Sequence, residues 1–236
     1  MSRPFHFKQF SISQENAAMK VGFDGVILGA WCNVTHSSSC LDLGTSTGLL
    51  ALMMAQRNAQ AKITAIEIDA ESCTDAQLNF EQSAFAHRLK LVQTDFLQWN
   101  SEETYAHIVS NPPFFIENTI AAGESRSKAR QAQHFPLQAW LPKAKELLAK
   151  GGKISFIYPS KEKSLIMRTA SAVGLHLHRE CWIKSNPDKL PHRILVELRL
   201  TAPLEMHSEE MCIRQSSSNN YHNDHISLCR DFYLHM

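Results

Sequence analysis

Four consecutive residues, Asn111-Pro112-Pro113-Phe114, combine groups that could hold a planar ring bearing an amine. They follow the apolar run 107–110, which predicts a buried strand that two prolines cannot continue. The result is a rigid turn at the carboxyl end of a strand, where open α/β sheets bind ligands. The Asn111 side-chain oxygen and a free backbone carbonyl at the turn could accept from an amine, while Phe114 offers a flat face for stacking. Taken alone, the string is about equally compatible with an ordinary turn.

A second set of residues lies upstream, in the loop that runs from Asp42 through Gly44 to Gly48. A short apolar strand at 40–43 precedes this loop, and a Leu- and Met-rich helix is predicted at 49–57. Glycines let a backbone approach a ligand closely, and the start of the helix donates N–H groups. A glycine loop by itself is weak evidence for a binding site, and the alternative is a structural turn flanked by acids.

Two further acids strengthen the prediction of a ligand site. Glu67 ends the next strand, 62–68, where an acid commonly binds the hydroxyl pair of a ribose. Asp95 follows the strand 89–94 and could accept a hydrogen bond from an adenine amine. With Asn111, four successive strands are therefore predicted to present polar groups at one edge of the sheet.

The acid that precedes the glycine loop helps to distinguish two kinds of cofactor. A dinucleotide enzyme usually shows the pattern G-x-G-x-x-G, whereas this loop reads G-T-S-T-G. Asp42 would repel a pyrophosphate but suits a cationic or amine-bearing ligand. S-adenosylmethionine combines a sulfonium, an amino-acid tail, a ribose and an adenine, and the sequence therefore favours it.

The order of predicted elements is typical of a doubly wound α/β fold. Strands at 40–43, 62–68, 89–94 and 107–110 alternate with helices at 49–57 and 70–83, which predicts a mostly parallel sheet. A helix is expected at 136–150, stopped by Gly151-Gly152 and followed by a strand at 153–158. Further predicted elements are a loosely alternating strand or hairpin from residue 5, a helix at 26–31, a helix at 161–173, and an antiparallel pair at 175–183 and 194–200.

The chain shows no repeat and no linker, so we expect a single domain over 1–236. Its parts are an N-terminal extension (1–35), a catalytic core (36–200) and a C-terminal tail (201–236) that completes the domain. The polar segment 117–135 is predicted to be a long loop or lid.

The charge is unevenly distributed although the formal net charge is only +1. Residues 121–200 carry 15 Lys and Arg against 6 Asp and Glu, whereas residues 1–120 carry 7 against 12. The basic block could bind phosphates, or it could consist of solvated lysines on helices. Candidate contacts to a nucleic-acid backbone are Arg126, Lys128, Arg130, Lys189 and Arg193.

The composition also argues against other classes of protein. The six cysteines are dispersed without a C-x-x-C pair, which favours free thiols in a reducing compartment. No apolar run reaches the roughly 18 residues of a membrane span, and the first residues lack a signal-peptide core. We therefore expect a cytoplasmic protein without a membrane anchor. The spacing of the histidines and cysteines between His207 and Cys229 matches no known zinc finger, so no metal site is expected.

The sequence resembles class I S-adenosylmethionine-dependent methyltransferases of the amino-methylating group marked by N-P-P-F/Y. More closely, it is similar to the bacterial family of tRNA(Val) adenine-N6 methyltransferases. The stretches that carry this resemblance span nearly the whole chain and are Phe7-Lys8-Gln9-Phe10, Ala18-Met19-Lys20-Val21-Gly22, Asp24-Gly25, Leu28-Gly29-Ala30-Trp31, Gly48-Leu49-Leu50-Ala51-Leu52-Met53, Ser110-Asn111-Pro112-Pro113, Pro191-His192-Arg193 and Phe232-Tyr233-Leu234.

The resemblance implies a Rossmann-like fold and methylation of the adenosine at tRNA position 37, 3′ to the anticodon. A monomer is expected. The resemblance also implies that Asn111, Pro112 and Phe114 hold the flipped adenine. Cofactor contacts are then expected from Asp42 and Gly44 at the methionine end, with Gly48 in the same loop. Glu67 is expected at the ribose and Asp95 at the adenine. Lys20 and Asp24 are expected to close the methionine end. The chain departs from the family at Ser46, where glycine is usual, and the segment 201–220 matches poorly.

Three other functions remain compatible with the residues. A protein glutamine-N5 methyltransferase would use the same turn on a side-chain amide, but usually carries an additional N-terminal helical domain. A DNA adenine methyltransferase would need a separate target-recognition domain, which is not visible. An RNA-binding module that has lost catalysis is the alternative from another class, with Ser46 as the lesion.

Overall fold

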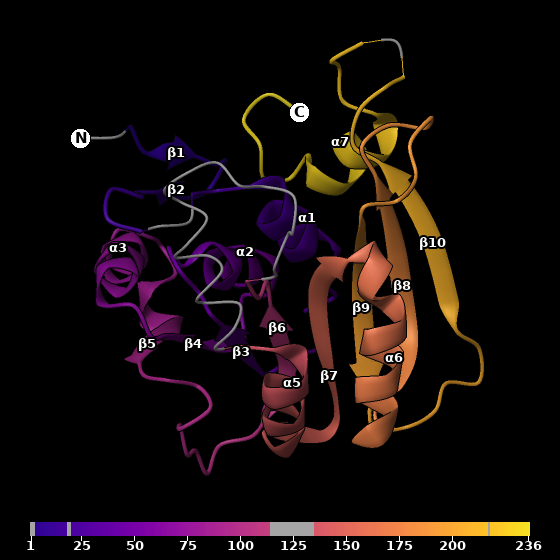
Figure 1. The fold of residues 1–236 in the computed structure, drawn as a ribbon. Helices are drawn as coiled ribbons and strands as arrows, with labels where there is room; N and C mark the ends of the chain where they lie inside the picture. Colours follow the sequence, from indigo (N-terminus) through magenta and orange to yellow (C-terminus); the bar gives the residue numbers. More distant parts are fainter. Residues whose placement is uncertain (1–2, 18–19, 114–134, 217) are drawn as a thin grey trace, which may run out of the picture.

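A computed structural model describes residues 3–17, 20–113, 135–216 and 218–236. Its centre is an eight-stranded sheet in the order β10-β8-β9-β7-β6-β3-β4-β5 (Figure 1). The strands of this sheet are β3 (Ser39–Leu43), β4 (Lys62–Glu67), β5 (Leu89–Gln93), β6 (Tyr105–Ser110), β7 (Leu148–Pro159), β8 (His176–Lys184), β9 (Arg193–Arg199) and β10 (His207–Cys212). A separate hairpin joins β1 (Phe5–His6) to β2 (Ser11–Ile12), as the alternation of phenylalanines predicted.

The direction of the strands positions the candidate site. β3 pairs in parallel with β4 on one side and with β6 on the other, and β4 pairs in parallel with β5. The carboxyl ends of these four strands therefore meet at one edge of the sheet. Only β9 is reversed among the described strands of this sheet, since it pairs antiparallel with β7 and β8. The prediction of a doubly wound, mostly parallel sheet with an antiparallel strand near one edge is confirmed.

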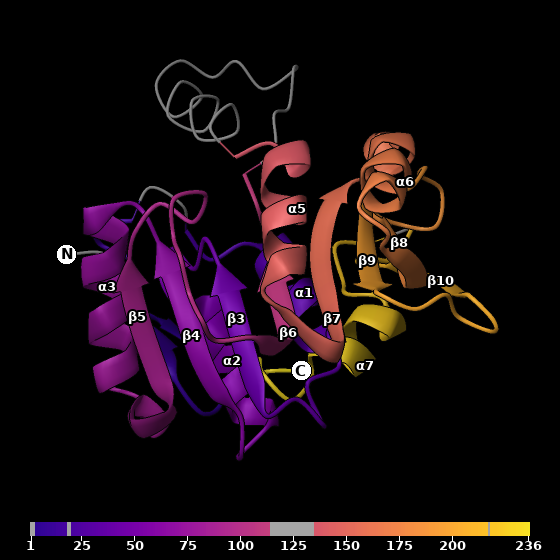
Figure 2. The same ribbon diagram turned by 90° about the horizontal axis from the view of Figure 1, so that it is seen from below.

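Helices cover both faces of the sheet and create two buried cores (Figure 2). One core joins the sheet to α1 (Phe23–Trp31), α2 (Leu49–Arg57), α3 (Ala70–Glu81) and the end of α7 (Asn223–Cys229). The other lies under α5 (Leu137–Glu146) and α6 (Lys163–Ala172). Single 3₁₀ turns occur at Ala86–Arg88 and Ser160–Glu162. The strands in between are buried on both faces, which explains why 40–43 and 107–110 show no alternation of apolar and polar residues.

The predicted boundary between the helix at 136–150, which is α5 in the structure, and the next strand was wrong. The helix ends at Glu146 rather than Lys150, and β7 begins at Leu148, which pairs with Tyr105. The register then shifts, so that His107 pairs with Lys153 and the extra residues of β7 form a bulge. Gly151 has a φ of 76° there. The two glycines thus permit an irregular strand, not the helix stop that the sequence suggested.

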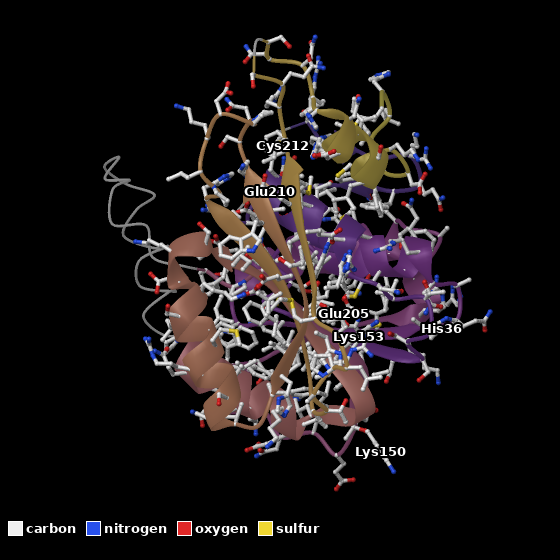
Figure 3. All side chains as sticks on the ribbon, turned by 90° about the vertical axis from the view of Figure 1, so that its right-hand side faces the viewer. His36, Lys150, Lys153, Glu205, Glu210 and Cys212 are labelled. Carbon is white, nitrogen blue, oxygen red and sulfur yellow. The ribbon has the colours of Figure 1, made fainter. Side chains whose placement is uncertain are left out.

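The C-terminal tail adds an edge strand and ties the two ends of the chain together. β10 pairs in parallel with β8, so it runs from the end that holds Glu205 and Lys153 towards Cys212 (Figure 3). Beyond it, a bridge between Phe7 and Tyr233 joins the tail to the N-terminal hairpin. Within the described ranges, no helix has the length and apolar character that a membrane crossing requires.

Candidate active site

The glycine loop between β3 and α2 has a backbone that only particular residues allow. Gly44 and Gly48 have φ values of 69° and 85°, in the left-handed region. A Cβ on Gly48 would lie 2.4 Å from Cε1 of Phe80, so that position has no room for a side chain. At Gly44 a Cβ would meet nothing within 4 Å, and the residue is exposed. The loop therefore packs tightly against α3 at one end and presents open space at the other.

Ser46, where the resemblance expects glycine, also adopts a positive φ, of 49°. This conformation costs a non-glycine residue on the order of 1–2 kcal/mol. Its backbone N–H donates to Oε2 of Glu67 at 2.8 Å, which holds the loop against the end of β4. Its Oγ is buried and has no hydrogen-bond partner among the described residues. The serine is thus accommodated by the fold and offers a hydroxyl for a further hydrogen bond.

Asp42 lies beneath the loop and is fully buried. Its Oδ2 accepts from Oγ1 of Thr45 at 2.6 Å and from the N–H of Ala51 at 3.0 Å, which links the loop to the first turn of α2. Its Oδ1 is buried without a partner in the described part of the chain. Burial raises the pKa of this carboxyl to about 7, against the two hydrogen bonds, which lower it. Because Oδ2 is already occupied, Asp42 can affect a ligand only by holding the loop in place or by accepting a hydrogen bond through Oδ1.

Glu67 at the end of β4 is the acid that joins three segments. Besides Ser46, its carboxylate accepts from the N–H groups of Ile68 and Asp69 at 2.9 and 3.0 Å through Oε1. Two carboxylate oxygens provide about four acceptor positions, so three bound N–H groups leave capacity for another donor. Asp95 lies two residues beyond β5, half-buried, and its Oδ1 accepts from the N–H of Leu97 at 2.9 Å.

Asn111 follows directly on β6 and is half-buried, while Pro112 is buried. The hydroxyl of Ser110 donates to the carbonyl of Leu43 at 3.0 Å and so joins this turn to the start of the glycine loop. A Cβ on Gly25 would lie 3.7 Å from Nδ2 of Asn111, which places the first turn of α1 against the amide. The sequence analysis did not predict that α1 borders the site here, although a glycine in the first turn of a helix can indicate close contact with a neighbouring segment. Phe114 lies outside the described residues.

The remaining candidates for cofactor contact lie on the N-terminal side of α1. Asp24 forms an ion pair with Arg193, whose Nε is 2.9 Å from Oδ2. Lys20 is exposed and its Nζ donates to the carbonyl of Gln14. Asp24 and Arg193, predicted for separate roles, are thus brought together, and they join α1 to the start of β9. Lys189 is exposed in the loop that precedes Arg193, whereas Arg126, Lys128 and Arg130 lie outside the described residues.

Two buried polar residues of α3 attach the N-terminal segment to this site, and sequence reasoning missed both. Nδ2 of Asn79 donates to the carbonyls of Ser13 and Thr47 at 2.8 and 2.9 Å, and its Oδ1 accepts from the N–H of Ser13. One turn earlier, Asp75 accepts from the N–H groups of Asn16 and Ala17. The signal was the spacing of two polar residues on the buried face of a helix. Asn79 connects the extension directly to the glycine loop.

The groups that could bind a ligand therefore form a row along the carboxyl edge of β6, β3, β4 and β5. The row contains an amide, a glycine loop with open space, a carboxylate with spare acceptor capacity and a second, half-buried acid. The described residues contain no group of three or more His, Cys, Asp or Glu arranged to hold a metal ion. This arrangement can hold an elongated ligand with hydroxyls and amines next to a second molecule at Asn111.

Comparison with known proteins identifies relatives of the whole chain. Residues 26–167 match the model of the family described as "Methyltransferase small domain". A tRNA1(Val) (adenine(37)-N6)-methyltransferase from Vibrio vulnificus (strain YJ016) is 41% identical over all of this chain and 97% of the relative. Proteins of the same name from Aliivibrio fischeri (strain MJ11) and Parabacteroides distasonis are 39% and 36% identical, each over 100% of both chains.

Solved structures share the fold at low sequence identity. A predicted O-methyltransferase from Agrobacterium tumefaciens superposes with a TM-score of 0.67 at 18% identity, over 89% of this chain and 96% of the other. A glycopeptide N-methyltransferase complexed with S-adenosyl-L-methionine gives a TM-score of 0.57 at 13% identity, over 78% and 91%.

The raised pKa of Asp42 predicts a pH dependence of stability. The unfolded chain releases this proton near pH 3.8, whereas the folded chain keeps it up to about pH 7. The stabilisation is complete below pH 3.8 and is lost as the pH rises through 7, a loss of roughly 4 kcal/mol in all. Urea unfolding at pH 5 and pH 8 should show a fall of about 2–3 kcal/mol in wild type that D42N lacks. The exposed control D188N should behave like wild type. Parallel pH curves for wild type and D42N would contradict the burial argument.

Proposed function

This chain belongs to the family of tRNA1(Val) (adenine(37)-N6)-methyltransferases, and we propose that it methylates the exocyclic N6 amine of adenosine 37 in tRNA(Val). Asn111 and Pro112 lie at the end of β6, directly beside the strand that leads into the glycine loop, and this position supports the proposal most strongly. This places an amide and a backbone carbonyl, both suited to an exocyclic amine, next to the part of the site that suits the cofactor.

S-adenosylmethionine is the cofactor, and the residues present fit it. The loop leaves open space at Gly44, and two buried oxygens, Oδ1 of Asp42 and Oγ of Ser46, have no partner among the described residues. We propose that the loop holds the methionine end, that Glu67 accepts from the ribose hydroxyls, and that Asp95 accepts from the adenine amine. Gly48 lets the loop pack on α3, and Lys20 and Asp24 border the methionine end from the side of α1. When bound, the cofactor supplies an electrophilic methyl group on a sulfonium.

The proposed work of the turn at Asn111 is to orient the adenine. Oδ1 of Asn111 and the carbonyl of Pro112 accept the two N6 hydrogens, and Phe114 stacks on the ring. Both hydrogen bonds draw the nitrogen lone pair out of conjugation with the ring and aim it at the cofactor side of the site. Catalysis then rests mainly on orientation, which can lower a barrier by several kcal/mol. No strong base is required, because N6 can lose its proton to solvent after it has been methylated.

We further propose that the enzyme acts as a monomer. We propose that the partner is the anticodon loop of the tRNA, and that the enzyme works in the cytoplasm, where tRNA is modified in bacteria. Contacts to the RNA backbone are assigned to the exposed Lys189 and to Arg126, Lys128 and Arg130. Arg193 is proposed to act differently from these, because its guanidinium is already paired with Asp24.

Replacement of Asn111 tests the proposed role of the turn. N111A should lower methyl transfer by about 100-fold or more, because an oriented hydrogen-bond partner is lost in the transition state. Binding of S-adenosylmethionine, followed by calorimetry, should stay within a factor of two of wild type. The matched control N33A removes an exposed asparagine at the other end of α1 and should leave both quantities unchanged. Transfer by N111A at the wild-type rate, with melting temperature unchanged, would contradict this role.

Neutralising the basic residues tests the proposed RNA contacts. Binding of tRNA by wild type should weaken steeply with salt, since each neutralised phosphate contributes close to one unit to the slope of log K against log [salt]. The combined variant R126Q/K128Q/R130Q/K189Q should bind tRNA more weakly and reduce that slope by about two to four units. Fluorescence anisotropy at several salt concentrations measures both quantities. An unchanged slope would place the RNA backbone elsewhere on the enzyme.

A further inference from the structure

Three residues that the reaction does not use, Phe23, Arg214 and Tyr221, form a cluster that we call the Phe23 platform. The guanidinium carbon of Arg214 lies 4.3 Å from the ring centroid of Tyr221 and 5.8 Å from that of Phe23. The two rings are 6.2 Å apart in an edge-to-face arrangement. Phe23 is 39% exposed at the start of α1, a helix whose residues from Gly25 onwards are buried. A large aromatic ring is therefore left open to solvent beside a planar cation.

The platform is held rigidly from beneath. The buried ring of His225 lies 4.8 Å from Tyr221 and 5.8 Å from Phe23. Burial and the nearby Arg214 lower the pKa of His225 to about 4, so this ring is neutral at physiological pH. Arg214 and Tyr221 face each other across an antiparallel bridge, and Nη1 of Arg214 donates to the carbonyl of Asn219. Preorganised aromatic and guanidinium surfaces bind a further planar group at low entropic cost.

The platform lies at the same edge of the sheet as Asn111. Phe23 is two residues from Gly25 on α1, about 5 Å between Cα atoms by helix geometry, and Gly25 lies against the Asn111 amide. Arg214 follows β10, which runs parallel to β8 and therefore ends at this edge, where Figure 3 shows Cys212. The backbone N–H of Arg214 donates to the carbonyl of Ser185, in the loop after β8, at 2.9 Å.

A polar pocket of about 450 Å³ adjoins the platform. It lies between the loop after β8 and the hairpin after β10, and its lining consists of hydroxyl and amide side chains together with Arg214. Those residues are Ser185, Asn186, Gln215, Ser216, Ser218 and Asn219. Such side chains can donate to and accept from the edges of a nucleobase, whereas an apolar peptide would leave them unpaired.

We propose that the Phe23 platform stacks a base of the tRNA anticodon loop next to the target adenosine, and that the adjoining pocket contacts the polar edge of that base. This inference rests on the proposed function, because it takes the RNA bound at Asn111 as its starting point. Aromatic rings and guanidinium planes are the surfaces on which unpaired bases stack in RNA recognition. Residues two apart on a helix point in different directions, so Phe23 would meet a nucleotide beside the one held at Asn111 and not the target adenosine itself. The platform thereby favours RNA with an accessible base on that side of the target.

The test compares F23L, which keeps an apolar side chain but removes the ring, with F23Y, which keeps the ring. F23L should raise KM for a tRNA(Val) transcript about 5- to 150-fold, the range of base stacking on an aromatic side chain, with kcat and S-adenosylmethionine affinity unchanged. F23Y should restore KM to near wild type, and R214K, which keeps the charge but loses the plane, should resemble F23L. The control L78A truncates a comparably exposed residue on α3 and should have no effect.

Substrates with an abasic site on either side of the target adenosine identify the stacked base. With one of the two abasic substrates, the KM of the wild-type enzyme should rise by the same factor that F23L produces with intact tRNA. The same abasic substrate should not raise the KM of F23L any further. If F23L and wild type respond equally to both abasic substrates, or if F23L changes kcat or cofactor affinity instead of KM, the platform does not stack a base. If the wild-type enzyme methylates tRNA and both F23L and R214K have the same KM as wild type, this inference is overturned but the proposed function is not. A wild-type chain that methylates no tRNA would overturn the proposed function and this inference with it.

Discussion

The parallel pairing of β3 with β4 on one side and β6 on the other is the constraint on which the site depends. It brings the glycine loop, Glu67 and Asn111 to one edge, although they are far apart in sequence. Three hydrogen bonds then fix their relative positions: Ser46 donates to Glu67, Thr45 to Asp42, and Ser110 to the carbonyl of Leu43. The strand ends set the positions of the groups, and these short bonds set their orientations.

The acids of the site have two different tasks because their surroundings differ. Asp42 is fully buried and has a raised pKa, and it stabilises the turn from β3 into α2. Glu67 is also buried, but its carboxylate receives three backbone N–H groups at the end of β4 and retains acceptor capacity for a donor from a ligand. The region proposed for the cofactor is therefore shaped mainly by backbone, whereas the region proposed for the target adenine presents the side chain of Asn111.

The sequence predicted correctly those helices and strands whose bounds depend on residues close together in the chain. The helix predicted at Leu49–Arg57 has those bounds in the structure, and the strand ends at Glu67 and Asn111 were placed to within a residue. The boundary of α5 and β7 was wrong, because Gly151 and Gly152 serve equally well in a helix stop or a bulge, and pairing with Tyr105 decides between them. The ion pair of Asp24 with Arg193 and the bonds of Asn79 to Ser13 join residues 169 and 66 positions apart, and no local pattern announces such contacts. The Phe23 platform was missed for the same reason, since it joins α1 to a hairpin near the C-terminus.

The groups at the ends of β3, β4 and β6 are proposed to hold S-adenosylmethionine beside an adenine amine of tRNA, so that the methyl group passes from the sulfonium to N6. The most direct measurement is a transfer assay with labelled S-adenosylmethionine, offered unmodified bulk tRNA and, separately, a release-factor-type protein that carries a candidate glutamine, with the products identified by mass spectrometry. We expect label in tRNA alone, recovered as N6-methyladenosine at position 37 of a single tRNA species. Label in the protein alone would contradict the proposal, and would show that the turn at Asn111 holds a side-chain amide instead of a nucleobase.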